Sequence, residues 1–513
     1  MQFLMGLDIG TTGTKAIVID EEGRIISRGY REYKLYHRKP IYSELDPKEV
    51  WDGIKGAIKD ALTGVDSRNV KAVGVSALGE AFMPVSKSGE PLYWSMTTFD
   101  ARARKYVEEW GEKMPEKEMF QITGQPLSPD IPIYTLHKIM WIRDHEPDIY
   151  NKTWKFMCWE DFFFFKLCGR PVIDYTLATR TMMFDIVKKR WSEDILNTAK
   201  LEEDILPEVG PSALVVGEVN EKGARETGLA KGTLLVTGGH DQACGAFGAG
   251  ITEEGPLMDA TGTVECYGIV QDRLVLKDDM RLQGYAVHVY VDPEKYYMFG
   301  FTPTGGAALR WIRDNFAKDL LEIEARTGKG PYDILNEEAE KSEPGAKGLM
   351  FFPYLEGSGT PDWNRNILGI MAGLTLAHNR GDVVRALFEG LAYELRWNVE
   401  SIRKFGIKVS EIRTIGGGAK SKLWLKIKAS VTGLSIRVPE AKMDTVALGA
   451  ALLAGIGSGI YADFLDAVRR TIRFEATIEP SKELLSKYEI FYKRYLASRK
   501  YLVKPFTEDQ PSP

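Results

Sequence analysis

One carboxylate has a position in the sequence that suits catalysis. Asp241 follows an apolar run at residues 233–237 and the glycines Gly238 and Gly239, and a segment of small residues, 243–249, comes after it. This order predicts a strand that gives way to a helix at Asp241, where a rigid frame can present a side chain to a ligand. The same order fits an ordinary helix start with Asp241 as the N-cap. Both interpretations stay open on this stretch alone.

A turn near the N-terminus has the composition of a phosphate site. Residues 10–15 read Gly-Thr-Thr-Gly-Thr-Lys between two predicted strands, 2–9 and 16–20, with a third strand expected from Ile25. Free backbone N–H groups, threonine hydroxyls and one cation together can hold an anion. Asp8 ends the first strand, where its carboxylate can hold Mg²⁺ through water. The alternative is a polar hairpin that binds nothing.

The second half of the sequence repeats this pattern. Residues 260–263 read Ala-Thr-Gly-Thr, again between two predicted strands. Two such hairpins predict a duplicated architecture, with one phosphate loop in each half and a nucleotide in the cleft between them. Glycine-rich turns at 304–306 and 416–418 each open a predicted helix, and such turns let backbone approach a ligand. Neither turn is the GxGxxG dinucleotide fingerprint, and the chain lacks the GxxxxGK[ST] P-loop.

A further pair of polar residues suits a sugar or polyol. Asp100 and Arg102 stand two residues apart at the end of a strand-rich region that includes a predicted strand at 70–76. Such a pair can face a polyhydroxylated ligand, or it can be a solvated pair on the surface. Asp46, followed by a proline, predicts a helix start with Asp46 as the N-cap. Residues 101–170 read as mostly helical.

The composition limits the class of protein. A chain of 513 residues is too long for one core, so two domains are expected. Hydrophobic residues at 44% and charged residues at 27% are ordinary for a soluble globular protein, and a net charge of −5 argues against a broad nucleic-acid surface. No stretch approaches the roughly 20 apolar residues of a membrane helix, and the N-terminus shows no apolar targeting segment.

The cysteines and histidines show no metal-binding spacing. The four cysteines form no CxxC pair, and the six histidines show no HxxxH pattern. We therefore expect reduced thiols in a cytoplasmic protein that has no nucleic-acid or membrane partner.

Taken together, the motifs resemble those of the FGGY family of carbohydrate kinases, in the wider actin-like ATPase group, nearly from end to end. The motifs are Asp8-Ile9-Gly10-Thr11-Thr12, Gly239-His240-Asp241-Gln242, Ala260-Thr261-Gly262-Thr263, Gly416-Gly417-Gly418-Ala419 with Trp424, and Gly369-Ile370-Met371-Ala372-Gly373-Leu374 followed by Arg385-Ala386-Leu387-Phe388-Glu389. The resemblance implies an α/β fold with two actin-like (ribonuclease H-like) domains, each a mixed sheet with flanking helices. ATP and a sugar would lie in the cleft between them. The expected boundaries are 1–248 for a sugar-binding domain, 249–500 for a nucleotide-binding domain and 501–513 for a tail.

The resemblance also implies roles for single residues. Asp241 becomes the general base for the sugar hydroxyl, and a helix N-terminus would favour its charged form. Phosphoryl transfer depends on in-line positioning and on charge neutralisation. The implied nucleotide contacts are Thr11, Thr12, Lys15, Thr263, Gly306, Arg310, Gly418 and Lys422, and Asp8 lies near Mg²⁺. The implied sugar contacts are Gly79, Glu80, Ala81, Phe82, Asp100, Asp241 and Gln242.

Departures from the family pattern bear on the substrate. Glycerol kinases carry Arg-Glu where this chain has Ala81-Phe82, and xylulokinases carry Met-His there. Residues 98–102 read Thr-Phe-Asp-Ala-Arg, where xylulokinases usually carry Trp-Asn-Asp-Gly-Arg. Residues 357–361 read Gly-Ser-Gly-Thr-Pro, where the family commonly carries Gly-Glu-Arg-Thr-Pro. We therefore expect an apolar wall in the pocket and a ketopentose (xylulose-like) or related sugar or alditol as substrate, rather than glycerol.

Two other readings stand beside this one. An actin-like ATPase with a chaperone or filament role would share the fold, but a chaperone needs a peptide-binding domain and a filament needs no acid in a sugar cleft. A kinase-fold binding protein would lack the base, whereas Asp241 is present. Family members are often homo-oligomers, so a dimer is expected from the resemblance.

Overall fold

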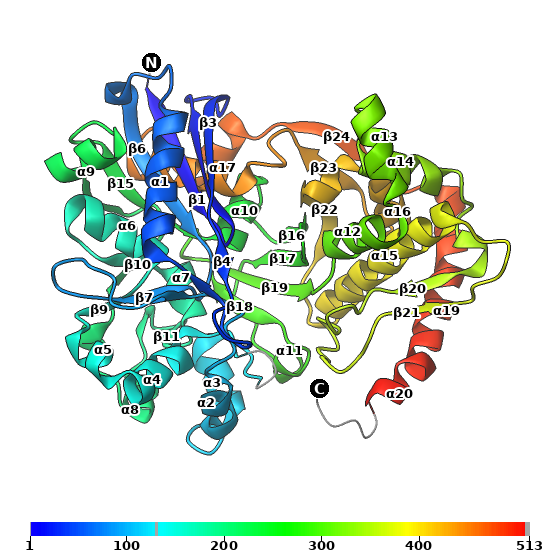
Figure 1. The fold of residues 1–513 in the computed structure, drawn as a ribbon, viewed down its shortest axis with the longest axis horizontal. Coiled ribbons are helices and arrows are strands. Elements are labelled where there is room, and N and C mark those ends of the chain that lie inside the picture. The colour runs from blue at the N-terminus through cyan, green and yellow to red at the C-terminus, as the bar shows by residue number, and fades with distance from the viewer. Residues whose placement is uncertain (1, 129–131, 508–513) are drawn as a thin grey trace.

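The computed structural model describes residues 2–128 and 132–507, which form two lobes side by side (Figure 1). The chain begins in one lobe and ends in the other, and the strands that lead from one to the other lie between them. Each lobe is built around a large mixed sheet with helices on its faces. This arrangement confirms the predicted two-domain α/β fold.

In the described part of the N-terminal lobe, six strands form a sheet in the order β14-β15-β6-β1-β2-β3. The strands are β1 (Phe3–Ile9), β2 (Gly13–Ile19), β3 (Ile25–Glu32), β6 (Val70–Ala77), β14 (Val215–Glu218) and β15 (Leu234–His240). Strands β1, β6 and β15 are parallel neighbours, while β2 and β3 continue from β1 as an antiparallel meander. The strands predicted at 2–9, 16–20, from Ile25 and at 70–76 are confirmed.

In the described part of the C-terminal lobe, seven strands form a sheet in the order β18-β19-β17-β16-β22-β23-β24. They are β16 (Gly255–Thr261), β17 (Glu265–Gln271), β18 (Ala286–Val289), β19 (Tyr296–Thr302), β22 (Val409–Gly416), β23 (Ile436–Pro439) and β24 (Phe474–Ile478). Strands β16, β22 and β23 are parallel neighbours, and β17, β19 and β18 extend the sheet from β16 as antiparallel neighbours in that order. Both sheets thus join a parallel trio to antiparallel strands through a Thr/Gly hairpin, as the two hairpins predict.

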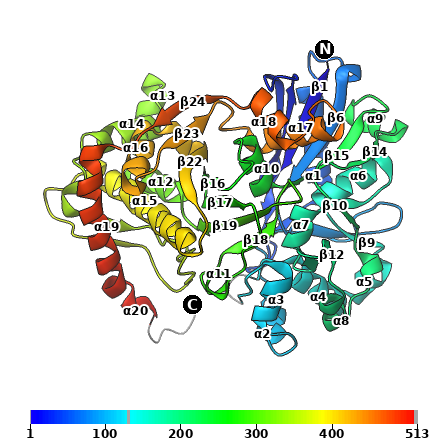
Figure 2. The same ribbon diagram turned by 180° about the vertical axis from the view of Figure 1, so that it is seen from behind.

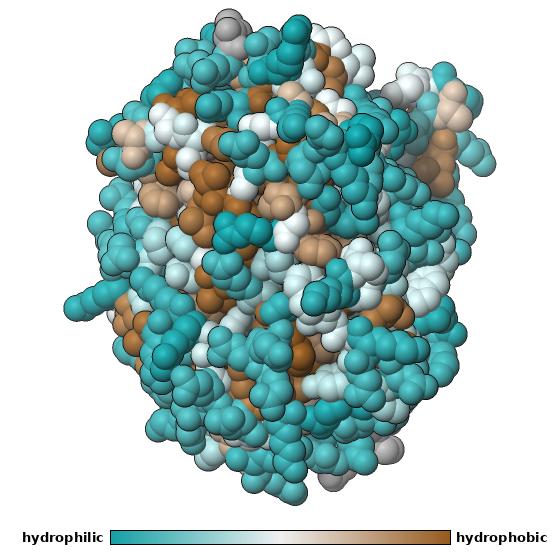
Figure 3. All heavy atoms as spheres, turned by 90° about the vertical axis from the view of Figure 1, so that its left-hand side faces the viewer, coloured by the Kyte–Doolittle hydropathy of each residue, from teal (hydrophilic) through white to brown (hydrophobic). Residues whose placement is uncertain are grey.

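Smaller sheets extend the N-terminal lobe and the far end of the C-terminal lobe. They contain β4 (Leu35–Tyr36), β5 (Glu44–Leu45), β7 (Phe82–Val85), β8 (Ser95–Met96), β9 (Lys155–Cys158), β10 (Val172–Asp174), β11 (Phe184–Asp185), β12 (Arg190–Trp191), β13 (Glu208–Gly210), β20 (Met350–Phe352) and β21 (Ile370–Ala372). Figure 3, a view onto the N-terminal lobe, shows a largely hydrophilic surface with a band of apolar side chains through it.

The helices cover the sheets and connect their strands. In the first half they are α1 (Pro47–Ala61), α2 (Arg104–Trp110), α3 (Glu116–Thr123), α4 (Thr135–His145), α5 (Pro147–Lys152), α6 (Trp159–Cys168), α7 (Tyr175–Arg180), α8 (Glu193–Ala199), α9 (Glu221–Thr227) and α10 (Asp241–Gly248). In the second half they are α11 (Asp278–Leu282), α12 (Gly306–Phe316), α13 (Asp319–Thr327), α14 (Pro331–Glu340), α15 (Arg380–Lys404), α16 (Lys422–Thr432), α17 (Thr445–Gly457), α18 (Phe464–Thr471), α19 (Lys482–Leu502) and α20 (Lys504–Thr507). In 2–128 and 132–507, no helix is long and apolar enough to cross a membrane.

Several helix boundaries follow from local chemistry. At α1 the Asp46 side chain accepts a hydrogen bond from the Lys48 amide at 2.8 Å, and Pro47 occupies the first turn, as predicted. Near the C-terminus, α19 continues to Leu502 and α20 follows it, past the expected start of the tail at residue 501. Residues 508–513, the rest of that predicted tail, lie outside the described residues.

Helices α10 and α17 cross between the two sheets, with backbone against backbone. A Cβ at Gly449 would lie 2.0 Å from the Cys244 carbonyl oxygen, and one at Gly248 would lie 1.9 Å from the Thr445 carbonyl oxygen. Figure 2 shows α17 lying along the N-terminal sheet, although it comes from the second half of the chain. A buried apolar cluster shared by α10, α17 and both sheets fills this region, so the two lobes are packed together there.

Candidate active site

Asp241 is the first residue of α10, directly after β15. The N-cap is His240, whose side chain makes no capping hydrogen bond, so the interpretation of Asp241 as the N-cap is wrong. A third of the Asp241 side chain is exposed, at the wall of a cavity. The junction of strand and helix predicted at this residue is confirmed.

The surroundings of Asp241 favour its neutral form. Burial raises its pKa to about 7, and repulsion by Asp8 and Glu80 adds to the rise. The helix N-terminus therefore does not keep this carboxylate ionised at low pH, contrary to the expectation from the helix dipole. His240 Nε2 lies 3.2 Å from Asp241 Oδ1, and burial lowers the pKa of His240 well below its usual value, so the imidazole is neutral. A carboxylate that titrates near neutral pH suits a general base.

The backbone that carries Asp241 is held by buried polar side chains that the sequence motifs did not reveal. Glu160 Oε1 accepts a hydrogen bond from the Gly238 amide at 2.9 Å, and Thr176 Oγ1 accepts one from the His240 amide at 2.6 Å. Asp174 Oδ1 in turn accepts from Thr176 Oγ1 at 3.0 Å. The signal in the sequence is the acid Glu160 beside the aromatic run, because a carboxyl group buried there needs polar partners.

A glycine is required where this strand turns toward the helix. Gly239 has a φ of 153°, and a Cβ there would lie 2.6 Å from Thr176 Oγ1. Because any side chain would displace the hydroxyl that holds the His240 amide, the second glycine of the motif is a packing requirement of the Asp241 frame.

A cavity of about 350 Å³ lies in front of Asp241, between the two lobes. Its wall includes the predicted residues Gly79, Glu80, Asp100, Asp241, Gln242 and Thr11. Val264, which follows Thr263, also lines it, so both Thr/Gly turns border the same space. Residues that were not among the predicted sugar or nucleotide contacts complete the lining: Leu78, Thr98, Phe99, Ala101, Pro132, Ile133, Arg180, His240, Cys266, Phe299, Phe301 and Arg365. The apolar wall expected from the sequence is therefore present: Phe99 contributes to it together with Phe299 and Phe301.

Ala81 and Phe82 do not belong to that lining. Phe82 begins β7 and is 1% exposed, and its ring packs 5.9 Å from that of Phe156. Ala81 is fully buried beside it. The chain enters a strand at this point, so both side chains pack in the core of the lobe and not against the cavity.

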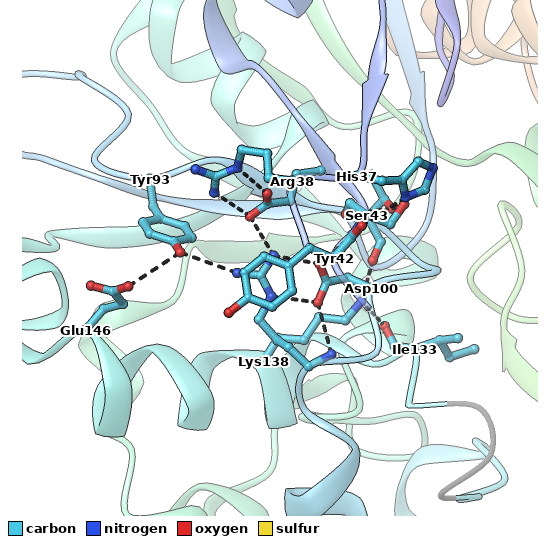
Figure 4. Close-up of polar contacts among 12 residues, drawn as sticks. His37, Arg38, Tyr42, Ser43, Tyr93, Asp100, Ile133, Lys138 and Glu146 are labelled. Carbon is cyan, nitrogen blue, oxygen red and sulfur yellow. Dashed lines mark hydrogen bonds and ion pairs between the residues drawn. The ribbon is translucent and has the colours of Figure 1, made fainter. Parts of the chain in front are cut away.

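Asp100 borders the cavity but is held within the protein, as Figure 4 shows. Its carboxylate accepts a hydrogen bond from the Ser43 amide at 2.8 Å and two from the Arg102 guanidinium, each at 2.7 Å. Arg102 also contacts Glu44 at 2.5 Å. Because Asp100 and Arg102 are both buried, the interpretation as a solvated surface pair is wrong. Asp100 lines the cavity, and Arg102 holds it in place from within the lobe.

Glu80 and Arg180 form an ion pair in the cavity wall. Glu80 has a φ of 60°, an unusual value for a residue with a side chain, and its Oε2 accepts a hydrogen bond from Thr98 Oγ1 at 2.9 Å. Arg180 also donates to Gln125, while its Nε has no partner among the described residues. A strained backbone and a spare buried donor at a cavity wall both favour a binding role.

The first Thr/Gly turn joins β1 to β2. The Gly10 amide donates to the Gly13 carbonyl at 3.0 Å, and Thr12 is exposed. Lys15 lies 3.1 Å from Asp444, at the start of α17, so its ammonium already has a carboxylate partner from the second half of the chain. Burial raises the pKa of Asp8 to about 6. Asp8 and Lys15 lie opposite each other on β1 and β2, so the structure brings them together beside the turn.

The second Thr/Gly turn contacts both predicted glycine turns. The Gly306 amide donates to the Gly262 carbonyl at 2.8 Å, and the Gly305 amide donates to the Thr263 carbonyl at 3.0 Å. A Cβ at Gly418 would lie 2.5 Å from the Cβ of Thr261. Arg310 on α12 and Lys422 at the start of α16 are exposed on the helices that follow these turns. Thr263, Gly306 and Gly418 therefore belong to one cluster of turns.

No group of three or more His, Cys, Asp or Glu residues that could hold a metal ion occurs within residues 2–128 and 132–507. A larger groove, of about 430 Å³, lies apart from this site between α1, α6 and residues 90–94, and none of the predicted site residues lines it.

A mixed sheet repeated in two lobes, a cavity bordered by a Thr/Gly turn from each, and a carboxylate at a strand-to-helix junction together define a two-domain kinase of the actin-like class. Residues 3–248 match the FGGY family of carbohydrate kinases, N-terminal domain, and residues 258–458 match the C-terminal domain of the same family. The chain therefore belongs to the FGGY family of carbohydrate kinases, and it is a sugar kinase.

Relatives and solved structures agree with this result. The chain is 30% identical over 514 residues to a xylulose kinase of Staphylococcus epidermidis, and the alignment covers 99% of this chain and 98% of the relative. It is 28% identical over 512 residues to a gluconokinase of Bacillus licheniformis, with 99% and 97% covered. The ligand-bound xylulose kinase structure from Lactobacillus acidophilus superposes with a TM-score of 0.89 at 22% identity, covering 99% of each chain, and so supports the fold.

Proposed function

We propose that this kinase transfers the γ-phosphoryl group of ATP to a hydroxyl of a ketopentose (xylulose-like) or a related sugar or alditol, with Asp241 as the general base. The observation that carries the proposal is the position of Asp241, at the wall of a cavity bordered by both Thr/Gly turns. The relatives named xylulose kinase support the choice of sugar.

The reaction transfers one proton to Asp241 and one phosphoryl group to the sugar. The sugar hydroxyl oxygen attacks the γ-phosphorus while its proton passes to Asp241, and the bond from phosphorus to the β,γ-bridging oxygen breaks to release ADP. Thr11, Thr12 and Thr263 would contact the phosphates, and Gly306 and Gly418 would leave room for the nucleotide. Arg310 and Lys422 would contact it from the helices. Closure of the lobes would keep water, a competing acceptor, out of the cavity.

Asp8 fits a place near Mg²⁺. It is half-buried at the end of β1, beside the first turn, and burial raises its pKa, so a nearby cation would stabilise its charged form. Mg²⁺ held there through water would offset charge on the phosphates.

The cavity wall suggests how the sugar is held. Glu80 can accept hydrogen bonds from sugar hydroxyls, and the unpartnered Arg180 Nε can donate one. Gln242 lies beside Asp241 and its Oε1 has no partner among the described residues. The aromatic residues Phe99, Phe299 and Phe301 present apolar faces on which the C–H side of a sugar can pack.

A second substrate class is favoured by one residue. Arg365 lines the cavity from the C-terminal lobe, is exposed, and has no carboxylate partner among the described residues. A guanidinium in that position can bind the carboxylate of a sugar acid bidentately. The gluconokinases among the relatives point the same way.

An ADP-release assay with ketopentoses, alditols and aldonates tests these proposals together. We expect one ketopentose to give the highest kcat/KM, and Arg365→Gln to change its KM less than twofold. If an aldonate is preferred instead and Arg365→Gln raises its KM at least tenfold, the second class is correct. ATP hydrolysis that no sugar stimulates would reject the phosphotransfer proposal and favour an actin-like ATPase.

We also propose that the protein is a dimer in the cytoplasm, and sedimentation velocity would test the dimer.

A further inference from the structure

A buried ion network lies directly beneath the second Thr/Gly turn. Lys428, on α16, places its Nζ 2.6 Å from Asp259 Oδ2 and 2.6 Å from Glu265 Oε1. All three side chains are at most 1% exposed. Asp259 lies on β16 and Glu265 on β17, so the two carboxylates stand on either side of the turn at residues 261–264. The charges of three separate elements therefore meet at one point.

Hydrogen bonds extend the network into the turn and toward the glycine-rich segment. Lys428 Nζ donates to Thr261 Oγ1 at 2.9 Å, and Thr261 Oγ1 donates to Asp259 Oδ1 at 3.1 Å. Asp259 Oδ2 also accepts from Thr414 Oγ1 at 3.1 Å, two residues before the glycine turn begins. The Thr261 side chain is the surface on which Gly418 packs. The same atoms thus fix both the Thr/Gly turn and the glycine turn.

The start of α12 rests on the other side of the network. A Cβ at Gly305 would lie 2.9 Å from the Cβ of Glu265, and the Gly305 amide bonds to Thr263. Burial raises the pKa of Glu265, and Lys428 opposes that rise, so the lysine offsets the acids that lie beneath the turn.

A buried ion pair is a poor way to gain stability, because the cost of desolvating its charges offsets their attraction, and apolar replacements are often as stable. What a buried charge network can provide is a fixed geometry for the groups around it. Here those groups are the three turns that face the nucleotide. We propose that Lys428 is a positioning residue for ATP: its charge and hydrogen bonds hold the Thr261, Gly305 and Gly418 segments in one frame. The proposal rests on the nucleotide site described under the proposed function.

Lys428→Met tests the role directly. The variant loses the hydrogen bonds to Asp259 and Thr261 and leaves the Asp259 charge uncompensated beneath the phosphate turn. We expect the dissociation constant of ADP, measured by isothermal titration calorimetry, and the KM for ATP each to rise at least tenfold. The KM for the sugar should change less than the KM for ATP, because most residues that line the cavity belong to the N-terminal lobe, although Val264 of this turn borders it. Adding Asp259→Asn, which removes the uncompensated charge, should recover part of the lost ADP affinity.

Arg385→Met is the matched control, since Arg385 forms a buried ion pair with Glu389 at 3.0 Å in the same lobe. It should lower Tm and leave ADP affinity within twofold. If Lys428→Met lowers Tm but keeps ADP affinity within twofold, the lysine is only structural and the proposal is overturned. If Lys428→Met does not fold, Lys428→Gln, which keeps a hydrogen-bond donor, takes its place. The dissociation constant of ADP and the KM for ATP then decide, and we expect ADP affinity to fall threefold or more.

Thr263→Ala separates this proposal from the one it rests on. It removes a predicted phosphate contact but leaves the network intact. Loss of ADP affinity in Thr263→Ala but not in the Lys428 variants would reject the positioning role alone. Unchanged ADP affinity in Thr263→Ala and in the Lys428 variants would reject the nucleotide site itself.

Discussion

The amide of His240 and the hydroxyl of Thr176 are joined by a hydrogen bond of 2.6 Å, one residue before the proposed base. This contact ties the end of β15 to α7, and through Asp174 to a buried polar network. The position of Asp241 is thus set by neighbours that are distant in sequence.

Thr176→Val should lower kcat by roughly tenfold, because it removes the acceptor of the His240 amide and lets the first turn of α10 shift, and misplaced catalytic groups lose rate steeply. Thr176→Ser, which keeps the hydroxyl, should retain most of the rate. Thr179→Val on the same helix is the control, since the Thr179 hydroxyl bonds only its own helix, at 2.8 Å from the Tyr175 oxygen. Steady-state kinetics at saturating sugar measure the difference. Equal rates for both valine variants would show that the Thr176 contact does not position the base.

Asp241→Asn should lower kcat by about 10²–10⁴-fold, the range that general-base removal usually costs. The amide keeps the shape of the carboxylate but cannot take a proton. ADP binding should stay within twofold, because neither phosphate turn is altered. A variant that turns over at near the parental rate would remove Asp241 from the chemistry.

The pH dependence follows from the raised pKa of Asp241, about 7. The base works when it is deprotonated, so kcat/KM should be constant above pH 8 and fall tenfold per unit below about pH 7. A rate profile that is flat between pH 5.5 and 8 would contradict the assignment. The measurement uses kcat/KM, because that constant reports the free enzyme.

The same shift has the opposite effect on stability. The folded state holds the Asp241 proton up to about pH 7, whereas the unfolded chain releases it near 3.8, so ionising this group costs stability as pH rises through that window. Asp241→Asn should therefore raise Tm by about 1–3 °C at pH 8 and by much less at pH 5. Thermal unfolding at the two pH values checks this, and an equal change at both would show that the charge is not the cause.

Gly449→Ala should destabilise the protein by about 1–3 kcal/mol or more, since overpacking a close contact forces backbone apart. Its Cβ would lie 2.0 Å from the Cys244 carbonyl oxygen at the crossing of α10 and α17. Gly111→Ala is the control, because nothing lies within 4 Å of a Cβ there. Chemical denaturation would measure both variants. A Gly449 variant as stable as the Gly111 variant would mean that the crossing tolerates separation.

The fold could be predicted well because its signals are local. The Thr/Gly turns, the apolar strands before them and the Asp46 N-cap all depend on neighbouring residues, and each appears where expected. The helical reading of 101–170 was less complete, since β9 interrupts it within a small sheet. Pairing with β7 decides that segment, and pairing between distant segments leaves no local mark.

The site was predicted in part for the same reason. Asp241 lies on the cavity wall with Glu80 and Gln242, but Arg180 and Arg365 reach it from elsewhere in the chain. Phe82 shows the reverse error, because the motif that contains it is continuous in sequence while its side chain points into the core. Residue type and spacing locate a loop, whereas tertiary packing decides which side chains of that loop face the ligand.

Helix α17 has a consequence for the modularity of this enzyme. Its backbone packs directly against β1 and β6. A Cβ at Gly6 would lie 1.8 Å from the Ala447 oxygen, and one at Gly74 would lie 2.0 Å from the Ala450 oxygen. A gene cut after residue 248 would therefore yield a sheet with one apolar face bare. The halves that sequence motifs divide so cleanly are not separable parts, and a chimera that exchanges sugar-binding halves between relatives must carry α17 with the first half.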